Sequence, residues 1–229
     1  GIAQPEKLKS RQEVYQEITP KLVFYLGKTF AKILFDETSK SPEEGVFASV
    51  SCDVRGSGLW IKDIFKRALI SSGINVNDSK MATTPMLYFS VIYYNCDGGV
   101  SITASHNTTE FNGMKQVKGV RNLETKQEIW PKLMSFDCIN TDRRGNIQEI
   151  NEFEYREAYK IMVKAHAVLG IRGWFERIKD KKPGRELQEE IDKIGQEIRQ
   201  IQKEIFKGLR LVVDPGSGAA FFAGEIFKE

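Results

Sequence analysis

The sequence lacks any long hydrophobic run: no apolar stretch approaches the roughly 20 residues that a membrane-spanning helix needs. No positively charged segment followed by an apolar one opens the chain, so no secretory signal is visible. Neither sign of charge dominates, because 34 Lys and Arg face 31 Asp and Glu and leave a net charge of +3. So small an excess does not indicate a nucleic-acid-binding surface. We therefore expect neither a membrane nor a nucleic acid as a partner.

Cysteine is also scarce. Cys52, Cys96 and Cys138 are odd in number, widely spaced and without the spacing of a metal site. Isolated cysteines of this kind are typical of reduced thiols inside cells, and we expect the protein to be cytoplasmic. A Walker loop is missing as well: the glycine-rich run 214–218 lacks the Gly-Lys-Ser/Thr ending and predicts only a turn.

The amino-acid composition is that of an ordinary globular protein. With 229 residues, of which 41% are hydrophobic, the chain can bury the core of one or two domains. Apolar spacing predicts a helix that begins at Pro20 with Thr19 as its N-cap. Further strands are predicted at 46–52, 74–76 and 100–103, and further helices at 59–71 and 86–94. This alternation predicts an α/β fold whose mixed or mainly parallel sheet is flanked by helices.

Residues 121–207 are strongly charged and predicted to be mostly helical. The segment 185–207 follows a turn at 180–184 and carries apolar residues spaced alternately four and three apart. These residues are Leu187, Ile191, Ile194, Ile198, Ile201 and Ile205. Two interpretations fit this seam: a surface helix that lies on its own domain, or a coiled-coil contact that makes a homo-oligomer.

The last residues change character again. A strand at 209–213, the turn at 214–218 and a helix at 221–227 read as the opening of a second α/β domain. So short a piece cannot bury its own core, so it either docks on the first domain or the natural protein continues. We expect a first domain at 1–207, in which 121–207 is a charged helical extension, and the start of a second domain at 208–229.

The most informative stretch is residues 99–115, GVSITASHNTTEFNGMK. A short apolar strand ends there at a polar cluster, which suits a strand that delivers a side chain to a loop at the edge of a sheet. Loops held by a rigid fold are where chemistry usually occurs. Taken alone, Ser105 is either a turn serine or a nucleophile, and a nucleophile needs a loop to position it and a base to help it.

TASHN followed by NGMK resembles the active-site serine loop of the α-D-phosphohexomutases, in the phosphomannomutase/phosphoglucomutase group. CDVRGSG at 52–58, TTPMLYF at 83–89 and LRLVVDPGSGAA at 209–220 resemble further segments of that family, in the same order. The resemblance implies that a serine passes a phosphoryl group to and from a hexose phosphate of mannose or glucose. It further implies interconversion of hexose 6-phosphate and hexose 1-phosphate through a bisphosphorylated sugar, with Mg²⁺ and with hexose 1,6-bisphosphate as activator.

Three residues are the catalytic candidates. By resemblance, Ser105 carries the phosphoryl group and binds the metal through it. His106 either fixes the loop backbone or orients the phosphoserine and moves a proton. Lys115 is either a solvated lysine or the general acid/base and a cation near the transferring phosphoryl.

Four further residues are candidates for phosphate and substrate binding. Arg55 offers a planar fork for phosphate, or else pairs with Asp53 as part of the fold. Asn107 is expected to bond the backbone groups that shape the loop. Asn112 and Gly113 form a strong turn signal that would bring the following lysine back toward the serine. The remaining histidine, on the predicted helix around residue 166, is expected to be structural.

The sequence also departs from the family pattern. Thr108 stands where the family loop has proline, which removes a fixed φ but no chemical group. The family's DGD-x-DR metal motif and GE-x-SG sugar-reading segment do not occur. We therefore expect a mutase that is incomplete in this chain. The alternatives are a non-catalytic sugar-phosphate-binding or oligomerisation module, and one half of a split mutase.

Overall fold

The computed structural model describes residues 18–38, 40, 44–135, 138–139, 141–205, 212 and 218–226. They fall into two compact units. The first comprises the chain up to Val91 together with Cys96–Glu149, and the second comprises Ile92–Asn95 together with the chain from Ile150. The stretch 121–207, expected to be one helical extension, is therefore divided at residues 149/150.

The first unit is built on a six-stranded sheet in the order β5-β4-β3-β1-β2-β6. The strands are β1 (Phe47–Cys52), β2 (Asn75–Met81), β3 (Gly98–Ile102), β4 (Met114–Lys118), β5 (Arg121–Asn122) and β6 (Ile147–Glu149). β1 pairs in parallel with β2 and β3, and β2 pairs in parallel with β6. β4 and β5 are antiparallel additions beside β3. The expected mainly parallel α/β sheet is confirmed.

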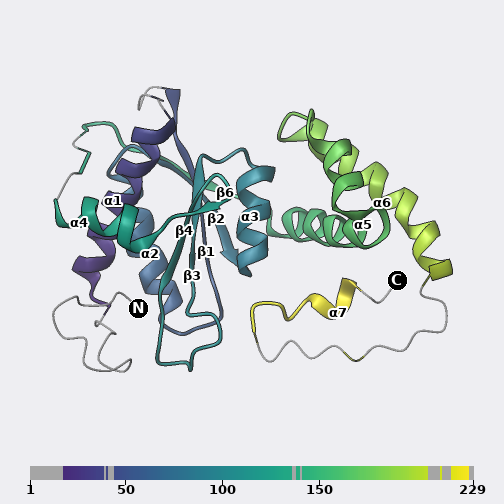
Figure 1. Ribbon diagram of the computed structural model, residues 1–229, viewed down its shortest axis with the longest axis horizontal. Coiled ribbons are helices and arrows are strands. Elements are labelled where there is room, and N and C mark those ends of the chain that lie inside the picture. Colours follow the sequence, from purple (N-terminus) through teal and green to yellow (C-terminus); the bar gives the residue numbers. More distant parts are fainter. Residues whose placement is uncertain are drawn as a thin grey trace. The chain divides into compact units, whose positions relative to one another are not determined.

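Helices cover both faces of this sheet. The helices of the described chain are α1 (Pro20–Thr38), α2 (Gly58–Ile70), α3 (Thr84–Tyr93), η3 (Thr125–Ile129), α4 (Trp130–Met134), α5 (Glu152–Ile178), α6 (Arg185–Ile205) and α7 (Ala223–Ile226). Figure 1 shows α1, α2 and α4 on one side of the sheet and α3 on the other. The cluster of buried apolar residues lies between the sheet and the helices α1, α2 and α4.

Local signals set several element boundaries as expected. The Thr19 hydroxyl oxygen accepts the backbone N–H of Leu22 at 3.2 Å and caps α1, which begins at Pro20. Gly73 ends the turn after α2 with a φ of +83°, a region that glycine enters without a steric penalty. The helix predicted at 86–94 is present as α3.

β2 is longer than predicted, because it runs to Met81 rather than ending near residue 76. The missed part contains Asn77, Asp78 and Ser79, polar residues that break the apolar pattern of a buried strand but are all buried here. The burial of Asp78 and Ser79 is tolerated because each has hydrogen-bond partners, whereas the buried Oδ1 of Asn77 has none in the described chain. The Asp78 carboxylate, for example, accepts hydrogen bonds from two lysine ammonium groups of α2.

The two faces of β1 differ in chemistry because successive side chains alternate across a strand. Val50 belongs to the apolar cluster beneath α1 and α2. Ser49 points the other way, where its hydroxyl lies 2.6 Å from those of Ser79 on β2 and Ser90 on α3. Small hydroxyls that satisfy one another thus line part of the α3 face.

The second unit contains α5 and α6, which pack against each other. Leu187, Ile191, Ile194 and Ile198 of the predicted seam are buried, whereas Ile201 is 41% exposed. This arrangement supports the interpretation of α6 as a helix that lies on its own unit, and a homo-oligomer through this seam stays a prediction. The turn before α6 is confirmed, with Gly184 at a φ of +94°.

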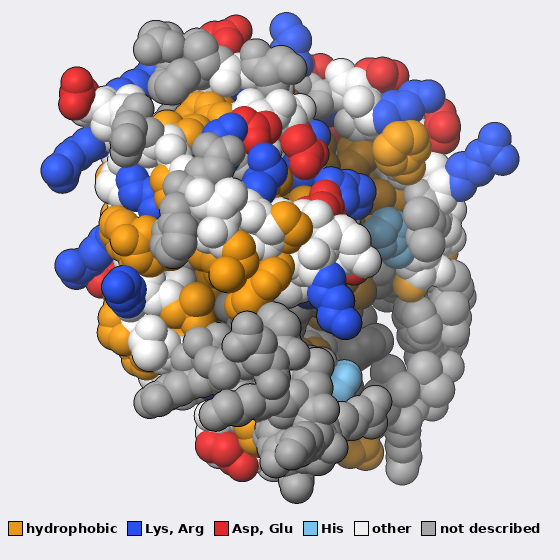
Figure 2. Space-filling view, turned by 60° about the vertical axis from the view of Figure 1, so that its left-hand side comes forward, with side chains coloured by type: hydrophobic (Ala, Val, Ile, Leu, Met, Phe, Trp, Pro, Cys, Tyr) orange, Lys and Arg blue, Asp and Glu red, His pale blue; other side chains and the backbone are white. Residues whose placement is uncertain are grey.

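The predicted strand at 209–213 and turn at 214–218 lie almost entirely outside the described residues. α7 occupies part of the helix predicted at 221–227. The start of a second domain at residue 208 therefore stays a prediction. No helix in the described part of the chain is both long and apolar enough to cross a membrane. On the face shown in Figure 2, basic and acidic side chains are interspersed.

Candidate active site

The serine loop, residues 103–113, joins β3 to β4. Its base is closed by the backbone N–H of Thr103, which donates to the carbonyl of Gly113 at 3.0 Å. The backbone N–H of Asp53, just beyond β1, donates to the carbonyl of Ile102 at 3.0 Å. The β1–α2 turn and the serine loop therefore meet at the carboxyl ends of β1 and β3. In open α/β sheets ligands bind at this edge.

Ser105 lies at the exposed end of the serine loop in a left-handed conformation, with a φ of +56°. Such a φ costs a non-glycine residue roughly 1–2 kcal/mol, so neighbouring contacts must hold it. Its hydroxyl oxygen lies 3.1 Å from Nε2 and 3.2 Å from Nδ1 of His106. Its backbone N–H donates to the Thr103 hydroxyl at 3.0 Å. The serine hydroxyl is thus accessible and in contact with a group that can exchange a proton with it.

Arg55, in the β1–α2 turn, forms several hydrogen bonds with the serine loop. Its Nε–H donates to the Asp53 carboxylate at 3.0 Å. Its four remaining N–H groups donate to loop carbonyls: Thr108 at 2.5 Å, Phe111 at 3.0 Å, Ser105 at 3.0 Å and Asn107 at 2.8 Å. Arginine has five N–H donors, and all five are used. The guanidinium thus pairs with Asp53 and lies under Ser105, but it keeps no donor for a phosphate.

The other predicted binding residues also shape the loop. The Asn112 side chain is buried, donates to the Ser57 hydroxyl at 2.9 Å and accepts the backbone N–H of Gly113 at 2.8 Å. The backbone N–H of Asn107 donates to the carbonyl of Ala104 at 3.1 Å. These contacts are therefore with the loop itself and with the β1–α2 turn, and direct substrate binding by these residues stays a prediction.

Lys115 lies on β4, which returns antiparallel to β3, and pairs in register with Ser101. The turn predicted at Asn112 and Gly113 is absent, because the turns of the loop lie at 105–106 and 109–110. The Lys115 ammonium nitrogen lies 5.5 Å from the centre of the Tyr88 ring on α3. The Tyr88 hydroxyl donates to the Asn122 side-chain oxygen at 2.7 Å. Among the residues that the structure describes, no carboxylate lies within ion-pair distance of Lys115, and no contact joins it to Ser105. The lysine is thus a cation near the loop without a described counter-ion.

His166 belongs to α5 of the second unit. Burial lowers the pKa of its imidazole, and its ring lies 5.8 Å from the Trp174 ring in an edge-to-face arrangement. These contacts agree with the structural role predicted for it.

The described residues contain no group of three or more His, Cys, Asp or Glu side chains that could hold a metal ion. A phosphate on Ser105 would offer one oxygen ligand, and Mg²⁺ commonly binds through phosphate oxygens together with one or two carboxylates. The serine loop can therefore supply part of a Mg²⁺ site at most.

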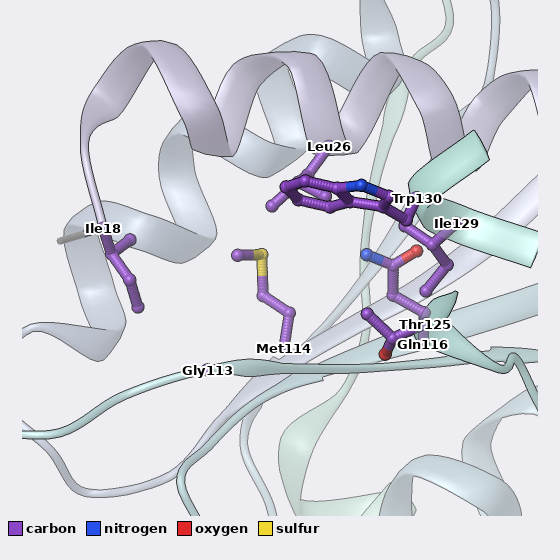
Figure 3. Close-up of a pocket in the computed structure, with 8 residues that line it drawn as sticks. All are labelled: Ile18, Leu26, Gly113, Met114, Gln116, Thr125, Ile129 and Trp130. Atoms are coloured by element: carbon purple, nitrogen blue, oxygen red, sulfur yellow. The ribbon is translucent and has the colours of Figure 1, made fainter. Parts of the chain in front are cut away.

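A small pocket lies between β4 and the helices α1 and α4 (Figure 3). Met114 and Gln116 project into it from β4, and Leu26 of α1 and Trp130 of α4 also line it. Lys115, between the two β4 residues, faces the opposite side because side chains alternate along a strand. Gly113, the last residue of the serine loop, also lines the pocket, so the pocket adjoins the base of that loop, whereas the Lys115 side chain lies on the opposite face of β4. It has no titratable lining residue.

The serine loop lies within a segment of the chain that matches a known protein family. Residues 6–130, more than half of the chain, match the α/β/α domain I of phosphoglucomutase/phosphomannomutase. The chain belongs to the phosphoglucomutase/phosphomannomutase family. Within it, the matched domain includes β1, Arg55 and the whole serine loop, so the resemblance drawn from TASHN and NGMK is confirmed.

Relatives in the phosphoglucomutase/phosphomannomutase family carry several mutase names. The phosphoglucomutase/phosphomannomutase of Thermococcus kodakarensis is 31% identical over 159 residues, which is 67% of this chain and 34% of the relative. The phosphoglucosamine/phosphogalactosamine mutase of Sulfurisphaera tokodaii is 40% identical over 130 residues, 56% of this chain and 27% of the relative. The chain spans about a third of the length of these relatives, and their names do not decide which hexose it would use.

A family protein of known structure, from Burkholderia thailandensis, shares the fold. It superimposes with a TM-score of 0.52 at 18% identity, over 64% of this chain and 32% of that protein. At this identity the likeness supports the α/β architecture alone.

Proposed function

We propose that this chain carries the phosphoserine centre of a hexose phosphate mutase that interconverts hexose 6-phosphate and hexose 1-phosphate. Family membership supports the reaction class. The single observation that carries the proposal is the placement of Ser105, exposed at the end of the serine loop with its hydroxyl in contact with His106.

In the proposed cycle, a hydroxyl oxygen of the hexose phosphate attacks the phosphorus of phospho-Ser105. The bond from phosphorus to the serine oxygen breaks, and the sugar becomes a bisphosphate. The sugar hydroxyl loses its proton to a base, for which Lys115 is our candidate, and His106 returns a proton to the serine oxygen. The bisphosphate then turns over and gives its other phosphate back to Ser105. Phosphoryl transfer depends mainly on alignment and charge neutralisation.

Lys115 suits this role because no carboxylate of the described chain neutralises it. As a cation it would attract the phosphate, and after losing its proton it would act as the base. We further propose Mg²⁺, with hexose 1,6-bisphosphate as activator. The metal would neutralise phosphate charge. Its remaining ligands would come from outside the described residues, and we derive no step through it. A cytoplasmic location also stays a prediction.

The test is Ser105→Ala in the protein expressed from its own gene. We expect hexose phosphate turnover to fall by at least about 10³-fold, because removing a nucleophile removes the covalent route. Incubation with hexose 1,6-bisphosphate should add one phosphoryl mass to the wild type and none to the variant. Ser135→Ala, an exposed serine outside the loop, is the matched control. Normal turnover by Ser105→Ala would refute the proposal.

The alternative, a sugar-phosphate-binding module or one half of a split mutase, predicts a different result from the same preparation. The wild-type protein would then bind hexose phosphates with no turnover of its own. A split mutase would regain turnover when a second polypeptide that supplies the metal ligands is added, whereas a binding module would not.

A further inference from the structure

The contacts of Arg55 fix more than the position of the serine loop. Four of its N–H groups are bonded to the carbonyls of residues 105, 107, 108 and 111, and its side chain is 9% exposed. Because these carbonyls converge on one planar group, the peptide units that contain them have a fixed orientation. The carboxylate of Asp53 neutralises the guanidinium, so its effect on the loop comes from hydrogen-bond geometry rather than from a free charge.

The orientation of a carbonyl determines that of the next amide. In a trans peptide the C=O and the following N–H point in opposite directions, and the described chain contains no cis peptide bond. The carbonyls of residues 105, 107 and 108 point inward to Arg55. The N–H groups that follow them therefore point to the outer side of the loop, where Ser105 is exposed.

These outward amides belong to His106, Thr108 and Thr109. None of them donates a hydrogen bond to another group in the part of the chain that the structure describes. Ser105, which precedes them, has a left-handed backbone. The N–H of Asn107, between His106 and Thr108, is used by the carbonyl of Ala104, whereas those of Thr108 and Thr109 are successive. Backbone N–H groups that gather in a turn beside a left-handed residue can form a concave site that favours anions.

We propose that Arg55 is a positioning residue that presents these three amides as a cradle for the phosphate carried by Ser105. The cradle would bind the phosphate oxygens by backbone donors and hold the phosphoryl group still for attack. Arg55 itself touches neither the phosphate nor the sugar. This inference rests on the proposed function, since it assumes that Ser105 becomes phosphorylated.

The first test uses wild-type protein expressed from its own gene and labelled with ¹⁵N. After phosphorylation by hexose 1,6-bisphosphate, with Ser105 occupancy confirmed by peptide mass, the amide protons of His106, Thr108 and Thr109 should move downfield. This shift is the signature of an N–H that donates to phosphate. Unchanged amide shifts in phosphorylated protein would overturn the cradle, whatever happens to any variant.

The second test is Arg55→Lys, which keeps the positive charge but cannot bond four carbonyls. We expect kcat to fall about 10²-fold, as for loss of a preorganised donor, with KM changed less than about threefold. The downfield amide shifts should disappear although the protein remains folded by circular dichroism. Arg67→Lys, on the exposed side of α2, is the matched control and should behave as the wild type.

Two outcomes of the Arg55→Lys experiment count against the inference. Unchanged kcat would show that the hydrogen bonds from Arg55 to the loop carbonyls are not needed. A raised KM at normal kcat would show that Arg55 binds substrate directly. The proposed function fails separately, through Ser105→Ala. If Ser105→Ala is inactive and Arg55→Lys is normal, only the cradle is refuted.

Discussion

At the scale of single residues, Asp78 makes a buried ionic interaction outside the serine loop. Its carboxylate lies 2.9 Å from the ammonium nitrogen of Lys62 and 2.6 Å from that of Lys66. Although burial opposes the charged form, these hydrogen bonds lower the pKa of Asp78 from 3.8 to about 2. Because the folded pKa is the lower one, the stabilisation is full above about pH 4 and is lost as the pH falls through 2.

We expect Asp78→Asn to lower the free energy of unfolding at pH 7 by about 3–5 kcal/mol, because it leaves the buried Lys62 and the half-buried Lys66 without a counter-ion. The variant should also lose part of the wild-type dependence of stability on pH between 4 and 2. Urea unfolding across that range measures both. Asp63→Asn, at an exposed i,i+4 pair with Arg67, should change stability by less than about 1 kcal/mol. Equal effects of the two substitutions would contradict this account.

At the scale of elements, β3 carries the serine loop and lies close to its neighbours. A Cβ at Gly98 would lie 2.5 Å from the carbonyl oxygen of Val117 on β4 and 2.7 Å from Cδ2 of Leu34 on α1. The carbonyl is backbone and cannot move without disturbing the pairing of β3 with β4. Glycine is therefore required at this position by close approach rather than by its φ.

We expect Gly98→Ala to destabilise the first unit by about 1–3 kcal/mol, the usual cost of overpacking. Turnover should fall as well, because a shifted β3 displaces Ser105. Thermal unfolding and steady-state kinetics test this. Gly56→Ala is the matched control for stability, since no heavy atom lies within 4 Å of its added Cβ. Wild-type stability of Gly98→Ala would show that the strands accommodate the methyl group.

At the scale of the whole molecule, each unit has its own buried residues. Phe65 is fully buried in the first unit and Ile194 in the second. Units with separate cores can unfold separately, so we expect two transitions in urea. Phe65→Ala should lower the stability of one transition by about 3–5 kcal/mol, and Ile194→Ala that of the other by about 2–5 kcal/mol.

Fluorescence and circular dichroism, followed together, distinguish the outcomes. A single transition that both variants shift alike would contradict separate cores. Midpoints that rise with protein concentration would instead support the homo-oligomer through the α6 seam, because a subunit interface is stabilised by mass action. Midpoints independent of concentration would agree with the packing of α6 on α5.

The sequence by itself determined what depends on near neighbours in the chain. The cap at Thr19, the alternation of strands and helices and the TASHN loop are all local patterns. The prediction that Ser105 and His106 form the reactive pair also rests on such a pattern, because the two residues are adjacent. Periodicity also predicted α6 and its apolar seam, since both arise within one helix.

Tertiary structure decided what depends on distant partners. The polar end of β2 is a strand because lysines of α2 satisfy Asp78, which no local pattern shows. Only the folded chain shows that α6 packs against α5 with four residues of its seam buried. From the sequence, Arg55 could either bind a phosphate or stabilise the fold. The pairing of β1 with β3 places it beside a loop about 50 residues later in the chain. Its five donors are all satisfied there, and that count follows only from the folded geometry.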